Sequence, residues 1–160
     1  MDKQEQRRTS FDNIAELYDE VRPQYPLALV EDLIKYTSYE LSDWMLEVGC
    51  GTGKATSMFA KKSCKIIALE PGEAMADITA KKLTNYPDCK VEVAKFEDWQ
   101  SVPKRFQVVY AAQSFHWIRP EVKYQKSANL LTDNGHLAIF WNNKFYDNSQ
   151  IRKELDNIYE

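Results

Sequence analysis

Three glycines at alternate positions are the part of the sequence best suited to chemistry. Gly49, Gly51 and Gly53 follow the apolar run 44–48 and precede an amphipathic segment that begins at Lys54. This pattern predicts a buried strand, a tight loop and a helix. Because glycine has no Cβ, its backbone can adopt positive φ, and a ligand can approach the main-chain N–H groups where the helix starts. The sequence therefore predicts a binding loop.

An acidic residue closes the next apolar run, which spans residues 65–69. Glu70 follows Gly49 by about twenty positions, the spacing at which α/β nucleotide-binding folds place an acidic residue on the ribose hydroxyls. The glycines and Glu70 together predict a site for a cofactor that contains adenosine.

The spacing of the glycines separates two classes of cofactor. Dinucleotide-binding loops follow G-x-G-x-x-G, which would need glycine at the position of Lys54. The segment 47–53, Glu-Val-Gly-Cys-Gly-Thr-Gly, instead resembles motif I of the class I S-adenosylmethionine-dependent methyltransferases. The helix N-terminus can bind the carboxylate of the methionine half, and Glu47 is available to its ammonium. A nicotinamide-dependent oxidoreductase is the weaker alternative.

Composition sets the broad class of protein. The 160 residues, with 44% apolar and 28% charged residues, predict one globular domain over residues 1–160. The net charge of −3 lacks the excess of basic residues that is typical of nucleic-acid-binding proteins. Without a long apolar run or a secretion signal, we expect a cytoplasmic protein with no membrane partner. The cysteines Cys50, Cys64 and Cys89 lack metal-site spacing, so we expect reduced thiols and no metal.

Strand-like and helix-like segments alternate along the chain. We expect strands at residues 44–48, 65–69, 90–94, 106–111 and 135–141. We expect helices at residues 12–18, 26–37, 54–61, 73–83, 120–131 and 149–159. This order predicts a doubly wound, Rossmann-like α/β fold, with a mainly parallel sheet and helices on both faces. Ligands of such sheets bind beyond the carboxyl ends of the strands.

The resemblance to methyltransferases continues before the glycine loop. Residues 11–18, Phe-Asp-Asn-Ile-Ala-Glu-Leu-Tyr, and residues 22–26, Arg-Pro-Gln-Tyr-Pro, are similar to the leader of the family's small-molecule enzymes. The resemblance implies a lid over the cofactor, with Tyr18 and Arg22 near its methionine half. Core packing of Tyr18 and a surface ion pair of Arg22 are the alternatives.

The third expected strand runs into a segment that the family places beside the adenine. Residues 94–99 read Ala-Lys-Phe-Glu-Asp-Trp. The resemblance implies that Phe96 stacks on the purine and that Glu97 addresses its polar edge. Asp98 is the competing carboxylate, and a simple end to the strand is the alternative. We expect Trp99 to be a packing residue.

The segment after the fourth expected strand borders the acceptor in the same family. Residues 111–118, Ala-Ala-Gln-Ser-Phe-His-Trp-Ile, resemble the A-x-x-x-H-W segment of the branch of trans-aconitate methyltransferase-like enzymes. This implies a cofactor contact for Gln113. His116 is the candidate catalytic residue, with a structural hydrogen-bonding role as its alternative. We expect His136 to open the fifth strand and to be solvated.

The expected cofactor site draws on the whole chain. It comprises Tyr18, Arg22, Glu47, Gly49, Gly51, Gly53, Glu70, Pro71, Met75, Phe96, Glu97 and Gln113.

The chemistry of the expected cofactor explains the lack of a catalytic triad. The sulfonium of S-adenosylmethionine already activates the methyl group, so transfer needs alignment and a pocket with little water. The sequence thus predicts a methyltransferase for a small-molecule acceptor, for which we consider a carboxylate docked by Arg22 and Arg119. The alternative is a cofactor-binding module or fragment without turnover.

The resemblance also divides the chain and suggests what is missing. It implies a helical lid and first helix over residues 1–37 and an α/β core over residues 44–160, where Asp133 and Asn134 replace two turn residues of the family. About five strands are expected where the family has seven, so the C-terminal part of the family fold is expected to be absent. An open sheet edge favours association, and a homodimer through that edge is left open.

Overall fold

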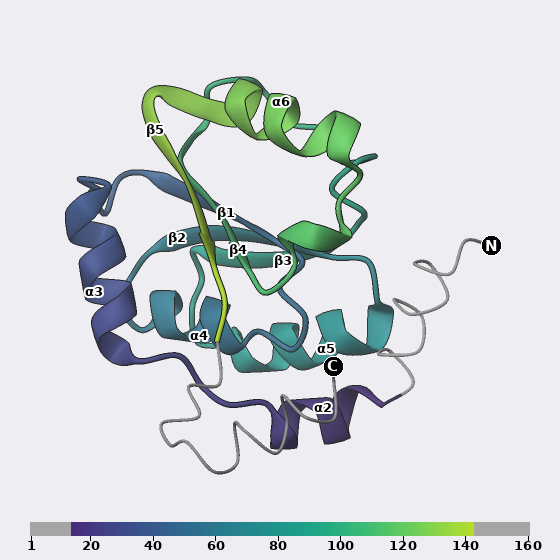
Figure 1. Ribbon diagram of the computed structural model, residues 1–160. Coiled ribbons are helices and arrows are strands. Elements are labelled where there is room, and N and C mark those ends of the chain that lie inside the picture. Colours follow the sequence, from purple (N-terminus) through teal and green to yellow (C-terminus); the bar gives the residue numbers. More distant parts are fainter. Residues whose placement is uncertain (1–13, 143–160) are drawn as a thin grey trace, which may run out of the picture.

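One five-stranded sheet organises the protein (Figure 1). The computed structural model describes residues 14–142. The strands are β1 (Trp44–Val48), β2 (Lys65–Glu70), β3 (Cys89–Val93), β4 (Phe106–Ala112) and β5 (Leu131–Phe140). All pair in parallel, in the order β3-β2-β1-β4-β5. The expected doubly wound sheet is confirmed, and the order reverses between β1 and β4, where such sheets bind ligands.

Helices cover the two faces of this sheet. They are α2 (Ala15–Val21), α3 (Leu27–Tyr36), α4 (Lys54–Ala60), α5 (Glu73–Lys82), α6 (Pro120–Leu130) and the short 3₁₀-helix η1 (Phe115–Trp117). In Figure 1, α4 and α5 lie below the sheet and α6 lies above it. The helix expected at residues 149–159 lies outside the described residues, as does the start of the helix expected at residues 12–18. Among residues 14–142, no helix has the length and apolar character needed to cross a membrane.

The side chains of β1 point alternately to the two faces of the sheet, and both faces are buried under helices. Met45 belongs to one buried cluster with Phe59 of α4, whereas Leu46 belongs to a second cluster with Leu130 of α6. Successive side chains of a strand point to opposite faces, so a strand buried on both faces has a continuous apolar sequence. The three cysteines are free and buried, in agreement with the expected thiols.

Strand β5 differs from the expectation at its start. We expected it to begin at residue 135, but it begins at Leu131, directly after α6. The pairing then shifts, because Leu131 pairs with Phe106 and His136 pairs with Val108. A Cβ on Gly135 would lie 3.0 Å from the Leu131 side chain, so the chain folds back between these pairs. The turn-forming residues therefore make a bulge within the strand.

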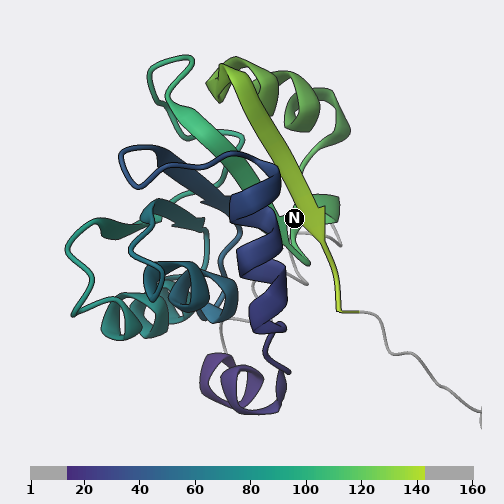
Figure 2. The same cartoon turned by 90° about the vertical axis from the view of Figure 1, so that its left-hand side faces the viewer.

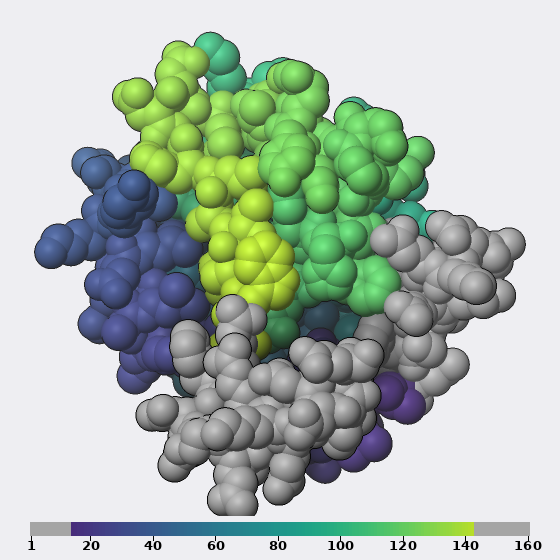
Figure 3. Space-filling view, viewed as in Figure 1, coloured from purple at the N-terminus to yellow at the C-terminus, as the bar shows by residue number. Residues whose placement is uncertain are grey.

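The sequence predicts a solvated His136, whereas the residue is half-buried. His136 lies inside β5, its Nδ1 is buried, and its ring centroid is 6.1 Å from that of Tyr36. In the part of the chain that the structure describes, β5 is one edge of the sheet and runs beside α3 (Figure 2). Figure 3 shows β5 in yellow at the surface between α3 and α6. The partial burial of the histidine thus comes from α3, which the sequence pattern of β5 alone does not reveal.

Helix α2 is tied to the glycine loop by charge. The Lys82 ammonium lies 2.6 Å from the Asp19 carboxylate and also donates to the Thr52 carbonyl at 2.8 Å. Lys54 lies 3.4 Å from the same carboxylate. Burial raises the pKa of Asp19, but the hydrogen bond from Lys82 and the charges of Lys82 and Lys54 bring the pKa below its ordinary value. The leader is therefore held against the loop it was expected to cover.

Candidate functional site

The glycine loop adopts the backbone that its sequence predicted. Gly49, Gly51 and Gly53 have φ values of +69°, +56° and +76°. A Cβ on Gly49 would lie 2.7 Å from the Cβ of Ser114, which follows β4. No side chain fits there, so Gly49 lets the ends of β1 and β4 come together.

The backbone N–H groups of the three glycines all donate hydrogen bonds within the protein. Gly49 donates to the Leu69 carbonyl at 2.9 Å, and Gly53 donates to the Cys50 carbonyl at 3.0 Å. Gly51 donates to the Glu70 carboxylate at 2.8 Å. The loop therefore offers a ligand its shape rather than these particular donors.

Glu70 organises two loops at once. One carboxylate oxygen accepts the Gly51 N–H, and the other accepts the Gly72 N–H at 2.9 Å. The carboxylate thus ties the glycine loop to the turn after β2, at the border of the cavity. The sequence suggested a ligand contact for Glu70 and missed its part in shaping the glycine loop.

Glu47 is a fully buried carboxyl group at the end of β1. Its Oε2 accepts hydrogen bonds from the hydroxyls of Thr56 at 2.6 Å and Tyr110 at 2.8 Å. Its Oε1 is buried and has no hydrogen-bond partner among the described residues. Burial raises the pKa of Glu47 from 4.5 to about 7. A buried oxygen without a donor points to a ligand that supplies one.

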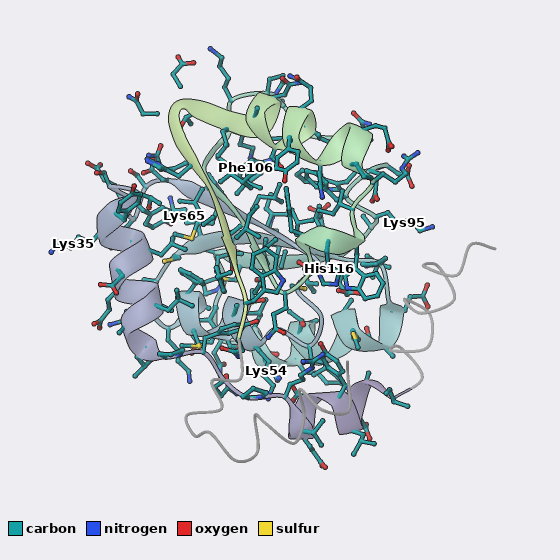
Figure 4. All side chains as sticks on the ribbon, in the orientation of Figure 1. Lys35, Lys54, Lys65, Lys95, Phe106 and His116 are labelled. Atoms are coloured by element: carbon teal, nitrogen blue, oxygen red, sulfur yellow. The ribbon has the colours of Figure 1, made fainter. Side chains whose placement is uncertain are left out.

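A cavity of about 220 Å³ lies at the carboxyl ends of the central strands. It is bordered by the glycine loop, the end of β2, the loops after β3 and β4, and the leader. In Figure 4, Lys54, Lys95 and His116 lie around this end of the sheet, whereas Lys65 and Phe106, which begin β2 and β4, lie at the other end. The cavity therefore lies where the topology of the sheet predicts a ligand site.

Nearly all the predicted residues reach this cavity. Those that line it are Tyr18, Arg22, Glu47, Gly49, Gly51, Glu70, Pro71, Met75, Phe96, Glu97, Gln113 and His116. Gly53 is not in the lining, because it caps α4 and packs against Thr79, to which an added Cβ would come within 2.9 Å.

The loop after β3 separates the two competing carboxylates. Phe96 and Glu97 line the cavity, and Asp98 does not. One oxygen of Glu97 accepts the N–H of Arg119 at 3.1 Å. Arg119 is not among the residues that line the cavity. Trp99 packs as expected, with its ring centroid 6.2 Å from that of Phe106.

Gln113 and Tyr25 join the leader to the end of β4. Gln113 has a positive φ of 60°, and its side-chain amide donates to the Tyr25 hydroxyl at 3.2 Å. Its N–H donates to the Phe140 carbonyl at 2.9 Å, and the Tyr25 ring meets the Phe140 ring edge-on. Sequence reasoning missed Tyr25, although it stands in the leader segment that pointed to Arg22.

His116 lies in η1 at the rim of the cavity. Its ring centroid is 4.7 Å from that of Trp117, which also lines the cavity. Burial lowers the pKa of His116, and the Lys123 charge adds to this effect. A neutral imidazole at this rim can accept a proton.

The comparison with known families decides the identity of this architecture. The methyltransferase domain family matches residues 45–135. The chain belongs to the class I S-adenosylmethionine-dependent methyltransferases. The matched range covers the glycine loop, the loop after β3 and the segment that holds His116. The cofactor of this domain is accordingly S-adenosylmethionine.

Relatives of this methyltransferase are longer. The probable S-adenosylmethionine-dependent methyltransferase CRG1 of Saccharomyces cerevisiae is 35% identical over 129 residues, which are 78% of this chain and 43% of that protein. The chain spans about half the length of the curated relatives it matches.

Solved structures show the same fold. A protein of Anaeromyxobacter dehalogenans assigned as a type II methyltransferase matches with a TM-score of 0.70 and 25% identity, over 86% of this chain and 56% of that one. Geranyl diphosphate C-methyltransferase from Streptomyces coelicolor, in complex with S-adenosyl-L-homocysteine, matches with a TM-score of 0.63 and 14% identity, over 82% and 52% of the two chains.

Proposed function

We propose that the chain binds S-adenosylmethionine in the cavity at the ends of β1 and β4 and transfers its methyl group to a small-molecule acceptor. The unpartnered buried oxygen of Glu47 carries this proposal, because the ammonium of the methionine half is a donor of the right charge. When bound, the cofactor supplies a methyl group already activated by a sulfonium. The protein has then to hold it, orient the acceptor and exclude water.

Different residues of the cavity bind different parts of the cofactor. In this proposal Glu47 and the loop at Gly49 and Gly51 receive the methionine half, and Tyr18 and Arg22 cover it from the leader. Glu70 lines the cavity at the end of β2, and its carboxylate accepts hydrogen bonds from the ribose hydroxyls.

In this proposal, the loops after β2 and β3 bind the adenine half. Phe96 offers a ring face for stacking, and Glu97 faces the polar edge of the purine. Pro71 and Met75 form the wall that follows Glu70, and Gln113 contacts the cofactor from the end of β4.

The rim of the cavity is the proposed acceptor site. Arg22 has its guanidinium carbon 4.9 Å from the centre of the Tyr18 ring, and His116 and Trp117 of η1 line the same cavity. A guanidinium binds a carboxylate through paired hydrogen bonds, which agrees with the resemblance to the trans-aconitate branch. A carboxylate attacks without losing a proton, whereas a protonated acceptor would pass its proton to His116.

Turnover with a panel of acceptors tests this function. With carboxylate acceptors, we expect Arg22→Ala to raise KM about tenfold, because it removes the paired hydrogen bonds. Neutral acceptors serve as the comparison and should keep their KM, and Arg119→Ala is the matched arginine control outside the cavity. An unchanged KM for carboxylates in Arg22→Ala would remove Arg22 from acceptor docking, and methyl transfer to no acceptor would favour a binding module.

We also propose that copies of the chain associate through β5, in the cytoplasm and without a nucleic-acid partner. Among residues 14–142, β5 is an edge strand, and an edge strand presents N–H and C=O groups that can pair with another strand. The net charge of −3 favours small substrates over nucleic acid. Sedimentation at high protein concentration should show dimers, and a monomer throughout would contradict association.

A further inference from the structure

Lys126 of α6 donates hydrogen bonds to the backbone of the loop after β3. The Lys126 ammonium donates to the Glu97 carbonyl at 3.0 Å and to the Trp99 carbonyl at 2.5 Å. These carbonyls flank Asp98, just after the cavity-lining residue Phe96. One side chain thus fixes the backbone of the loop on both sides of Asp98.

The same ammonium also fixes an aromatic ring. It lies 5.2 Å from the centre of the Phe96 ring, within the range of a cation–π interaction. Phe96 is only 3% exposed and shares a buried cluster with Leu130 of α6. The orientation of the ring that faces the cavity therefore depends on α6.

A second bond joins α6 to this loop. Arg119, the N-cap of α6, donates its N–H to the Glu97 carboxylate, so α6 holds both the side chain and the carbonyl of Glu97. Helix α6 also follows η1, which carries His116. The loops after β3 and β4 are thus positioned by one element.

Lys126 lies in an environment that needs these partners. Burial lowers the pKa of the Lys126 ammonium, and the charges of Asp98 and Glu97 partly offset that effect. A half-buried cation with three donors loses water contacts, and the two loop carbonyls replace them. An uncharged side chain of similar length would leave both carbonyls without this donor.

We infer that Lys126 is a positioning residue for the adenine end of the cofactor site. It acts through Phe96 and the Glu97 backbone, and it sets how sharply the loop distinguishes adenosine from a purine nucleoside with a carbonyl at the same edge. This inference rests on the proposed function, because it assumes that the cavity receives the adenine beside Phe96.

Calorimetric titration with S-adenosylhomocysteine and S-inosylhomocysteine tests the inference. We expect Lys126→Met to weaken binding of the adenosine ligand about five- to twentyfold and that of the inosine ligand less, so that the preference for adenosine falls. Lys126→Arg keeps the charge and the donors and should retain most of both. The matched control is Gln125→Met, an exposed neighbour on α6 whose side chain bonds to Asn129 of the same helix.

The outcomes separate the two proposals. A wild-type chain that binds neither ligand contradicts the proposed function itself. A wild-type chain that binds, with a Lys126→Met variant of equal affinity and preference, overturns the role of Lys126. An equal loss for both ligands also overturns it, because the loop would then not read the purine through Lys126. If Lys126→Met does not fold, Lys126→Gln, which keeps two donors, takes its place with the same expected direction.

Discussion

Replacing Glu47 with glutamine should stabilise the free protein at pH 8 and weaken its binding of S-adenosylmethionine. The folded protein holds the pKa of Glu47 at about 7, above the ordinary 4.5, because the group is buried. The native state therefore binds a proton more readily than the unfolded chain, and this contribution to stability is complete below about pH 4.5 and disappears as the pH rises through 7. Denaturant unfolding of the wild type should lose about 2 to 3 kcal/mol between pH 5 and pH 8.

The Glu47→Gln variant should lose this pH dependence, because its amide does not titrate. Its hydroxyl partners, Thr56 and Tyr110, can turn to donate or accept, so the packing around the side chain is kept. Glu73→Gln, at the exposed start of α5, is the matched control and should unfold like the wild type. A wild-type slope that persists in Glu47→Gln would mean that another group causes it.

Cofactor binding should show the opposite dependence on pH. An ammonium next to Glu47 favours the ionised carboxylate, so binding below pH 7 must release the proton of Glu47. Affinity for S-adenosylhomocysteine should be roughly eightfold higher at pH 7.5 than at pH 6.0 in the wild type. In Glu47→Gln it should be lower and nearly constant over that range. Titrations in buffers of different ionisation enthalpy measure the proton release directly, and its absence would contradict the contact.

Replacing Glu70 with alanine should weaken cofactor binding by about 1 to 3 kcal/mol, which is about five- to 150-fold. The variant loses the acceptor for the ribose hydroxyls, and it also leaves the N–H groups of Gly51 and Gly72 without their partner. Calorimetric titration gives the affinity, and thermal unfolding gives the separate cost of the unpaired N–H groups.

Two further variants separate these roles of Glu70. Glu70→Gln keeps one acceptor and should fall between the wild type and Glu70→Ala, whereas Glu73→Ala lies outside the cavity and should bind like the wild type. An affinity that Glu70→Ala leaves unaltered would remove Glu70 from the ligand site and leave it only its part in the loop.

The bounds of the central strands were predicted well, because short apolar runs in the sequence indicate buried strands. Strand β1 has the expected bounds, and β2 and β4 each extend one residue further than expected. The start of β5 could not be predicted in this way. Turn-forming residues there predicted a break, and the pairing of Leu131 with Phe106 keeps the segment in the sheet as a bulge.

Most residues of the cavity lining could also be predicted from the sequence, because the motif residues follow the ends of strands. What the sequence did not show are contacts between distant segments. Gln113 meets Tyr25, and Lys82 meets Asp19, only because the leader folds over the ends of the strands. Lys126 belongs to the same class, since nothing in the sequence of α6 reveals the carbonyls that it binds.

The most direct test of the central claim is calorimetric titration of the purified chain with S-adenosylmethionine, S-adenosylhomocysteine and NAD. Saturable binding of the first two at one site, with no binding of NAD, is the predicted result. Binding of NAD alone, or of none of the three, would contradict the assignment of the cavity to S-adenosylmethionine.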